Sequence, residues 1–90
     1  MPVYVDSWNA AYKGMLMCHL IADTKEELLS MVDAINVQRK WIQDEGKYSE
    51  HFDICLSKKK LAIQNGAIEI SSKDLVRKML AKKSNASHQD

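Results

Sequence analysis

Acidic and imidazole side chains are the groups of this sequence that could do chemistry. Five of them form the candidate catalytic set: Asp6, His19, Asp23, His51 and Asp53. Carboxylates and imidazoles bind divalent cations and transfer protons, so the set could serve either task. No HxxxH or HExxH spacing is present and no metal is assigned, but a metal-dependent enzyme would hold Mg²⁺ or Mn²⁺ with these five residues. Structural roles stay open too. His19 could be a hydrogen-bonded core histidine, and Asp23 could simply belong to the start of the helix that follows it. Asp6 and Asp53 could stabilise turns.

Cationic side chains supply a possible anion site. Lys58, Lys59 and Lys60 follow Ser57 in the first turn of a predicted helix, where the positive end of the helix dipole disfavours cations. A bound anion would offset that repulsion, although three lysines could equally solvate a surface. Arg39 could hold a phosphate or carboxylate with two hydrogen bonds, or pair with Asp53 as scaffolding.

Two aromatic residues, Trp8 and Tyr12, lie in a predicted loop over residues 6–14. They could stack over a base, or pack on the protein's own surface or a dimer partner. The charge is uneven along the chain, since Lys and Arg against Asp and Glu number five against nine in residues 1–56 and eight against three in residues 57–90. The basic last third has no aromatic residue to stack bases, so general nucleic-acid binding is weakly supported.

Short apolar segments predict the strands that position these groups. Residues 3–5 and 67–70 are expected to be strands, and the nearly continuous apolar run 15–22 reads as a buried strand. Residues 51–56 alternate, which predicts Phe52 and Ile54 on the inner face and His51, Asp53 and Cys55 on the other. A further short strand could lie within residues 36–43, before a polar loop 44–50 around Gly46.

The ends of these strands predict where a site would form. Asp6 and Asp23 each follow a strand, so we expect them near a shared edge of the sheet. We also expect Asp6, either His19 or Asp23, and Asp53 to converge in a single cleft.

Capping signals and apolar spacing predict three helices. Thr24 and Glu27 form a capping box, and an apolar stripe at helical spacing predicts a helix over residues 25–36. Ser57 is expected to cap a second helix of about two turns, which Asn65 and Gly66 would end. Ser71 with Asp74 marks the start of a third.

The order of elements predicts an α/β fold with a small mixed sheet of three to four strands flanked by about three helices. Residues 1–81 are expected to form a single domain, and residues 82–90 a polar, flexible tail. The hydrophobic content of 46% and charged content of 28% are typical of a soluble globular protein. A core this small makes a homodimer plausible.

Segment composition also bears on compartment. No apolar run approaches the roughly 20 residues of a membrane span, and the start of the chain has no signal-peptide pattern, so a cytoplasmic location is expected and no membrane partner. The two cysteines, Cys18 and Cys55, have no zinc spacing and are expected to be core thiols rather than a disulfide.

Several short motifs together resemble a known family, the domain of unknown function 4031, which is a small bacterial and phage family. The motifs are Val3-Tyr4-Val5-Asp6, Gly14, Cys18-His19-Leu20-Ile21-Ala22-Asp23-Thr24, Glu27-Leu28, Arg39, Trp41, Gln43, His51-Phe52-Asp53, Ser57-Lys58 and Gly66-Ala67. The resemblance runs from about residue 2 to about residue 80. It implies a shared fold and a source in a bacterium or a phage-infected cell, and it implies no known reaction.

The polar residues in that pattern favour a small pocket for a phosphorylated ligand such as a nucleotide. Arg39 and Lys58–Lys60 would hold the phosphate, with the aspartates on ribose or base. Two alternatives differ in class: a metal-dependent phosphoesterase or nuclease that uses the five candidate catalytic residues, and a phage or bacterial accessory protein that binds or inhibits a host protein.

Overall fold

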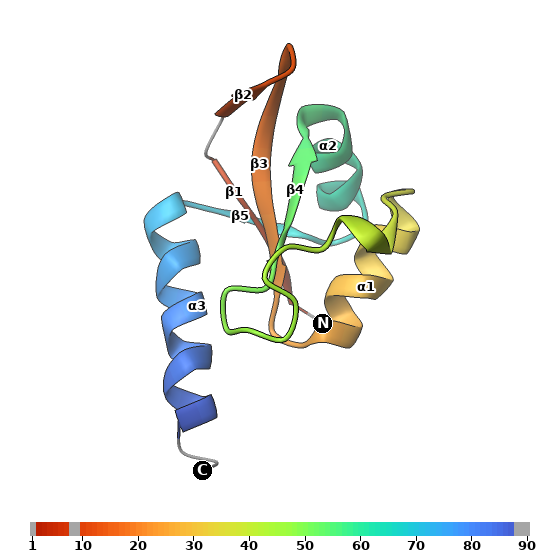
Figure 1. Ribbon diagram of the computed structural model, residues 1–90. Coiled ribbons are helices and arrows are strands. Elements are labelled where there is room, and N and C mark those ends of the chain that lie inside the picture. The colour runs from red at the N-terminus through yellow and green to blue at the C-terminus, as the bar shows by residue number, and fades with distance from the viewer. Residues whose placement is uncertain (1, 8–9, 88–90) are drawn as a thin grey trace.

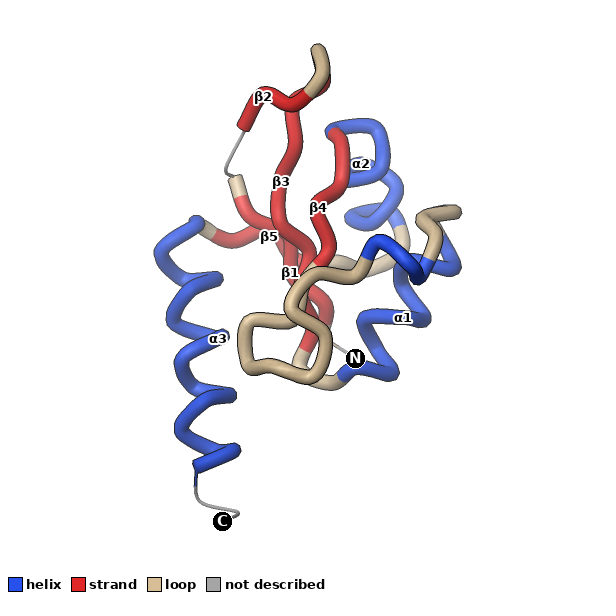
Figure 2. Tube along the Cα trace, viewed as in Figure 1, coloured by secondary structure: helices blue, strands red, loops and turns tan. Residues whose placement is uncertain are grey.

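The computed structural model describes residues 2–7 and 10–87 and shows one α/β domain, which confirms the predicted fold class. A sheet lies between helices α1 (Lys25–Ala34) and α2 (Leu56–Gln64) on one face and α3 (Ser72–Ser87) on the other (Figure 1). The helices, the strands and the long loop that precedes the fourth strand are distinguished by colour in Figure 2.

The sheet is mixed and has β3 (Met15–Ala22) at its centre. One edge of β3 pairs antiparallel with β1 (Val3–Asp6) and β2 (Ala10–Tyr12), and the other edge pairs antiparallel with β4 (Phe52–Cys55). The last strand, β5 (Ile68–Ile70), runs parallel to β1 on its far side. The register therefore brings β1, β3 and β4 side by side.

The sheet has five strands, one more than the upper number expected, because the segment predicted as loop 6–14 contains β2. A two-residue turn joins β2 to β3, and both of its residues have positive φ, 49° at Lys13 and 79° at Gly14. Turns of this kind match the twist of a hairpin, and glycine adopts the required conformation without strain.

Alternation along the strands divides the apolar residues between the two faces. The larger core lies under α1 and α2 and includes Val5, Leu20, Phe52 and Ile54 together with the stripe of α1. The face under α3 holds a smaller cluster of Tyr4, Ile21 and Leu75. Residues that share the alternation of Tyr4 and Ile21, among them Asp6 and His19, therefore point toward α3.

Helix caps follow the predicted signals in part. The Thr24 hydroxyl accepts a hydrogen bond from the Glu27 amide at 3.2 Å, as expected, but the Glu27 carboxylate accepts from that hydroxyl at 2.8 Å instead of from the Thr24 amide. The predicted Ser57 cap of α2 is wrong, because the helix already begins at Leu56 and Cys55 is its N-cap residue. Gly66, at φ 103°, follows the end of α2 as predicted.

Two other segments differ from expectation. Residues 36–43 contain the short 3₁₀ helix η1 (Arg39–Trp41) rather than a strand, and Gln43 pairs with His51 to close the loop between them. Helix α3 continues through residues 82–87, which lie in the segment expected to be a tail. Within the part of the chain that the structure describes, no helix is long and apolar enough to cross a membrane.

Candidate metal centre

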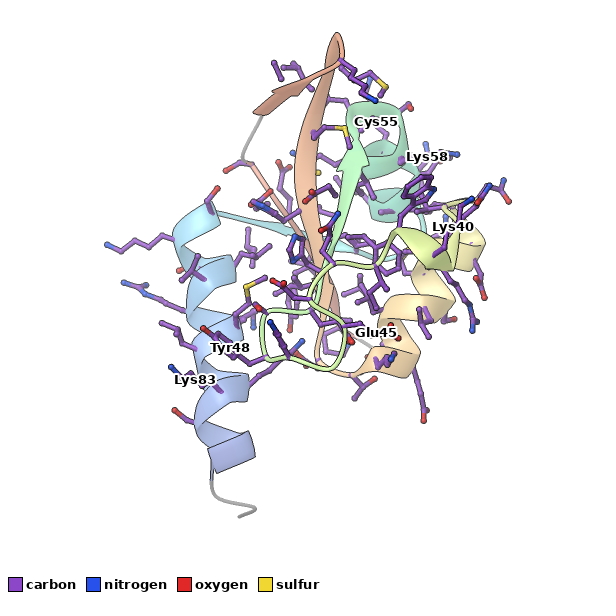
Figure 3. All side chains as sticks on the ribbon, in the orientation of Figure 1. Lys40, Glu45, Tyr48, Cys55, Lys58 and Lys83 are labelled. Atoms are coloured by element: carbon purple, nitrogen blue, oxygen red, sulfur yellow. The ribbon has the colours of Figure 1, made fainter. Side chains whose placement is uncertain are left out.

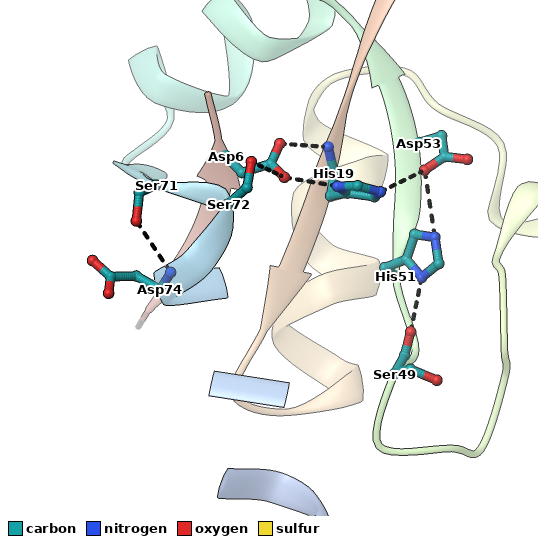
Figure 4. A network of polar contacts seen from close by, with 8 residues as sticks. All are labelled: Asp6, His19, Ser49, His51, Asp53, Ser71, Ser72 and Asp74. Carbon is teal, nitrogen blue, oxygen red and sulfur yellow. Dashed lines mark hydrogen bonds and ion pairs between the residues drawn. The ribbon is translucent and has the colours of Figure 1, made fainter. Parts of the chain in front are cut away.

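Asp6, His19 and Asp53 form a row across three neighbouring strands on the face under α3. Asp6 ends β1, His19 lies in the interior of β3, and His19 and Asp53 are direct partners in the β3–β4 register. His51 enters the same face from the residue before β4. Figure 4 shows these four side chains, which we call the histidine–aspartate cluster, linked in one network.

Asp6 is the most deeply buried side chain of the cluster. Its side chain is 1% exposed, and one oxygen accepts a hydrogen bond from the backbone amide of His19 at 2.9 Å. The other oxygen lies 2.7 Å from His19 Nδ1 and accepts a longer bond of 3.4 Å from the Ser72 hydroxyl. Asp6 therefore fixes both the backbone position and the ring orientation of His19.

The two imidazole rings meet nearly at right angles, with centroids 5.3 Å apart and an interplanar angle of 76°. His51 Nδ1 lies 2.8 Å from the backbone oxygen of Ser49, so each ring has an oxygen acceptor at Nδ1. In a neutral imidazole an acceptor at Nδ1 requires the hydrogen there, which leaves the lone pair on Nε2.

Both Nε2 atoms approach the same oxygen of Asp53. His51 Nε2 lies 3.4 Å from Asp53 Oδ1 and His19 Nε2 lies 3.9 Å from it. His19, His51 and Asp53 each offer one possible ligand atom, and these three atoms all lie within 4.8 Å of one another. Two ring nitrogens and one carboxylate oxygen are thus close together, and a bound cation would stabilise that arrangement.

A cavity of about 320 Å³ opens beside the cluster. Its lining comprises Asp6, His19, Ser49, His51, Ser72, Leu75, Val76 and Met79. The serine and apolar residues of this lining were not among the predicted site residues. Neither the Ser49 carbonyl nor the apolar side of α3 carries a sequence signal for a site, because both reach it only through tertiary packing.

Asp23 does not join the cluster, and the expectation that it shares a sheet edge with Asp6 is wrong. β1 and β3 run antiparallel, so the residues that follow the two strands lie at opposite ends. The amide of Asp23 donates to the carbonyl of Pro2, at the beginning of β1, while Asp6 ends that strand beside His19.

The cations expected to hold phosphate lie elsewhere. Arg39 donates two hydrogen bonds to Asp33, at 3.0 and 2.6 Å, so the alternative pairing with Asp53 is wrong. The Arg39 guanidinium holds the pKa of the Asp33 carboxyl below its usual value. Lys58 lies on α2 (Figure 3), which packs on the face of the sheet opposite to α3 and the histidine–aspartate cluster. Of the predicted loop aromatics, Trp8 and the side chain of Tyr12 fall outside the described part of the chain.

Lys59 differs from its two neighbours. It is buried, and its ammonium group pairs with Glu69 of β5 at 2.7 Å. The sequence predicted either that all three lysines are solvated or that they share a bound anion. Neither prediction explains a buried Lys59 that pairs with a carboxylate. Lys59 therefore joins α2 to the edge of the sheet.

This ion pair predicts that the three lysines respond differently to replacement. Lys59→Gln should lower the free energy of unfolding by about 1–2 kcal/mol, because Glu69 loses its partner and a buried stem is shortened. Lys58→Gln and Lys60→Gln are the matched controls and should stay within about 0.5 kcal/mol of the parent. Urea denaturation measures all three. Equal stability of the three variants would show that the pair contributes nothing.

The cysteines are both free thiols, but only one is a core residue. Cys18 is fully buried, and burial raises the pKa of its thiol to about 12. Cys55 is half-buried, and a contact with the Ser57 hydroxyl at 3.2 Å is the main cause that lowers its pKa.

Comparison with known proteins identifies the family. A family model described as "Protein of unknown function (DUF4031)" matches residues 3–82. The chain belongs to this family. The match confirms the resemblance seen in the sequence motifs, and the matched segment includes the whole histidine–aspartate cluster. No curated protein and no solved structure matches the chain.

Proposed function

We propose that this protein is a metal-dependent hydrolase in which His19, His51 and Asp53 bind one divalent transition-metal ion. The observation that carries the proposal is the convergence of the two Nε2 atoms on Asp53 Oδ1, at 3.9 and 3.4 Å. Ligand atoms of a tetrahedral zinc ion are about 3.3 Å apart, given metal–ligand distances of about 2.0–2.2 Å. Small side-chain movements would bring the three residues to that spacing.

The partners of the two rings support the same proposal. Metal-binding histidines commonly donate their second ring N–H to a carboxylate or a backbone carbonyl, which fixes the tautomer and makes the ligand more basic. Asp6 provides the carboxylate for His19, and Ser49 provides the carbonyl for His51. Asp6 thus acts as a positioning residue rather than as a ligand.

The number of ligands favours catalysis over a structural role. Structural zinc sites have four protein ligands, whereas catalytic sites have three and keep a position open for water or substrate. Here the set has three candidate ligands, and two of them, His19 and His51, line a cavity of about 320 Å³. A metal ion in such a site lowers the pKa of bound water to about 7 and so supplies hydroxide at neutral pH.

The ligand types also bear on which metal fits. Imidazole suits zinc and other transition metals, whereas magnesium prefers oxygen ligands and retains several waters. We therefore favour Zn²⁺ over the Mg²⁺ and Mn²⁺ considered from the sequence. A pocket for a phosphorylated ligand has less support, because Arg39 pairs with Asp33 and Lys59 with Glu69.

Titration of the EDTA-treated protein with Zn²⁺, Mn²⁺ and Mg²⁺ in a calorimeter tests the metal centre. We expect one ion per chain, with Zn²⁺ bound more tightly than Mn²⁺ or Mg²⁺. Metal at about 100 times its Kd should add about 2.7 kcal/mol to the free energy of unfolding. The loaded protein should hydrolyse carboxylic or phosphoric ester test compounds, and EDTA should abolish the activity. Absence of metal binding would refute the proposal and leave a host-protein adaptor as the stronger candidate.

A further inference from the structure

One side of the site cavity is apolar. Leu75, Val76 and Met79 of α3 face His19 and His51 across it, with Ser49 and Ser72 among the other lining residues. Leu75 is buried, but Val76 is 51% exposed although it lines the cavity. An apolar ligand group placed there would remove this surface from water, which is favourable in proportion to the area covered.

Several contacts hold α3 in position over the sheet. The Lys82 ammonium donates to the carbonyl of Ala22, the Lys78 ammonium lies 4.1 Å from the centroid of the Tyr4 ring, and Ser72 bonds to Asp6. The apolar side of the cavity is therefore attached to the same strands that carry His19 and Asp6. A substrate lying along α3 would keep a defined distance from the metal ion.

The charges at the cavity disfavour an anionic substrate. Among the described residues that line it, none is a lysine or an arginine. The carboxylates of Asp6 and Asp53 would balance a divalent ion, so the loaded site carries little net charge. A phosphodiester would bring a negative charge against this apolar side, with no lysine or arginine among the described lining residues to pair with it.

On the basis of the proposed function, we propose that the substrate is a carboxylic ester whose apolar acyl group lies against Val76 and Met79. Water at the metal loses one proton to solvent, and its oxygen forms a bond to the carbonyl carbon. The bond between that carbon and the ester oxygen then breaks. The ester oxygen leaves with the electron pair and takes a proton from solvent, so one water is consumed and one acid and one alcohol form.

Steady-state hydrolysis of 4-nitrophenyl acetate, butyrate and hexanoate by the Zn²⁺-loaded protein tests the substrate class, with bis(4-nitrophenyl) phosphate as the anionic counterpart. We expect kcat/KM to rise up to about fourfold per added methylene, chiefly through KM. The phosphodiester should be cleaved far more slowly. Rates of the EDTA-treated protein are subtracted, which removes hydrolysis by uncomplexed histidines.

Val76→Ser and Leu80→Ser provide a matched pair of variants. Val76 and Leu80 lie one turn apart on α3 and are 51% and 49% exposed, but only Val76 lines the cavity. Val76→Ser should flatten the dependence on acyl length, whereas Leu80→Ser should retain it. Both should bind Zn²⁺ as the parent does.

The outcomes separate this inference from the proposed function. Faster cleavage of the phosphodiester, no dependence on acyl length, or equal effects of the two serine variants would overturn the acyl-ester assignment while the metal hydrolase stands. Zinc binding without hydrolysis of any test compound would overturn both the assignment and the hydrolase. A failure to bind metal would overturn the metal centre itself.

Discussion

Replacement of His51 by alanine should lower the affinity for Zn²⁺ by about 100-fold or more, equivalent to about 2.7 kcal/mol of binding free energy. The variant removes one of three ligands, and the remaining His19 and Asp53 form an incomplete set. His51 is the informative ligand to replace because its ring contacts the Ser49 carbonyl, Asp53 and the His19 ring rather than residues of the larger core. The fold should therefore persist. Titration calorimetry of the EDTA-treated variant measures the loss.

Asp33→Asn is the control for this measurement. Asp33 is an exposed carboxylate that pairs with Arg39 and lies outside the cluster, so its replacement should leave zinc affinity unchanged. Undiminished zinc binding by His51→Ala would place the metal elsewhere on the chain.

The second large effect should come from Asp6→Asn. The amide retains an oxygen for the backbone N–H of His19, but its NH₂ group then faces Nδ1 and favours the tautomer with hydrogen on Nε2. That tautomer cannot bind a metal through Nε2. We expect a loss of about 10–100-fold in zinc affinity. Stability should also fall by about 1–3 kcal/mol, since a buried charge-assisted hydrogen bond is lost.

A readout of tautomer distinguishes positioning from simple destabilisation. Nitrogen-15 chemical shifts of the His19 ring should report hydrogen on Nδ1 in the parent and on Nε2 in Asp6→Asn. Lys59→Gln is a useful comparison, because it should lose stability without any change in the His19 tautomer or in zinc affinity. Identical ring shifts in the parent and Asp6→Asn would contradict the role assigned to Asp6.

Local patterns in the sequence determined much of the framework of this site. The alternation of residues 51–55 predicted that His51 and Asp53 share one face while Phe52 and Ile54 enter the core, and burial follows that alternation. The capping residue Thr24 and the apolar stripe after it predicted α1, and Gly66 predicted the end of α2. These features depend on backbone geometry over a few residues, so nearby sequence is sufficient to predict them.

Strand direction and register were decided only by the tertiary structure. The antiparallel pairing of β1 with β3 separates Asp23 from Asp6, and the register places Asp6 beside His19 and His19 beside Asp53. A shift of one residue would turn the side chains of a strand to the other face of the sheet. Local sequence patterns do not contain that choice, because it depends on how both faces of the whole sheet are buried.

The partners of the cations were likewise a tertiary outcome. Arginine and lysine are residue types that bind phosphate, yet Arg39 forms an ion pair with Asp33 and Lys59 forms one with Glu69. The apolar side of the cavity comes from α3, which is distant in sequence from His19 and Asp6 but packs across their strands. Residue type indicates what a side chain can bind. The packing of distant segments decides which groups that side chain contacts, because burial of apolar surface stabilises the fold more than any one exposed ion pair does.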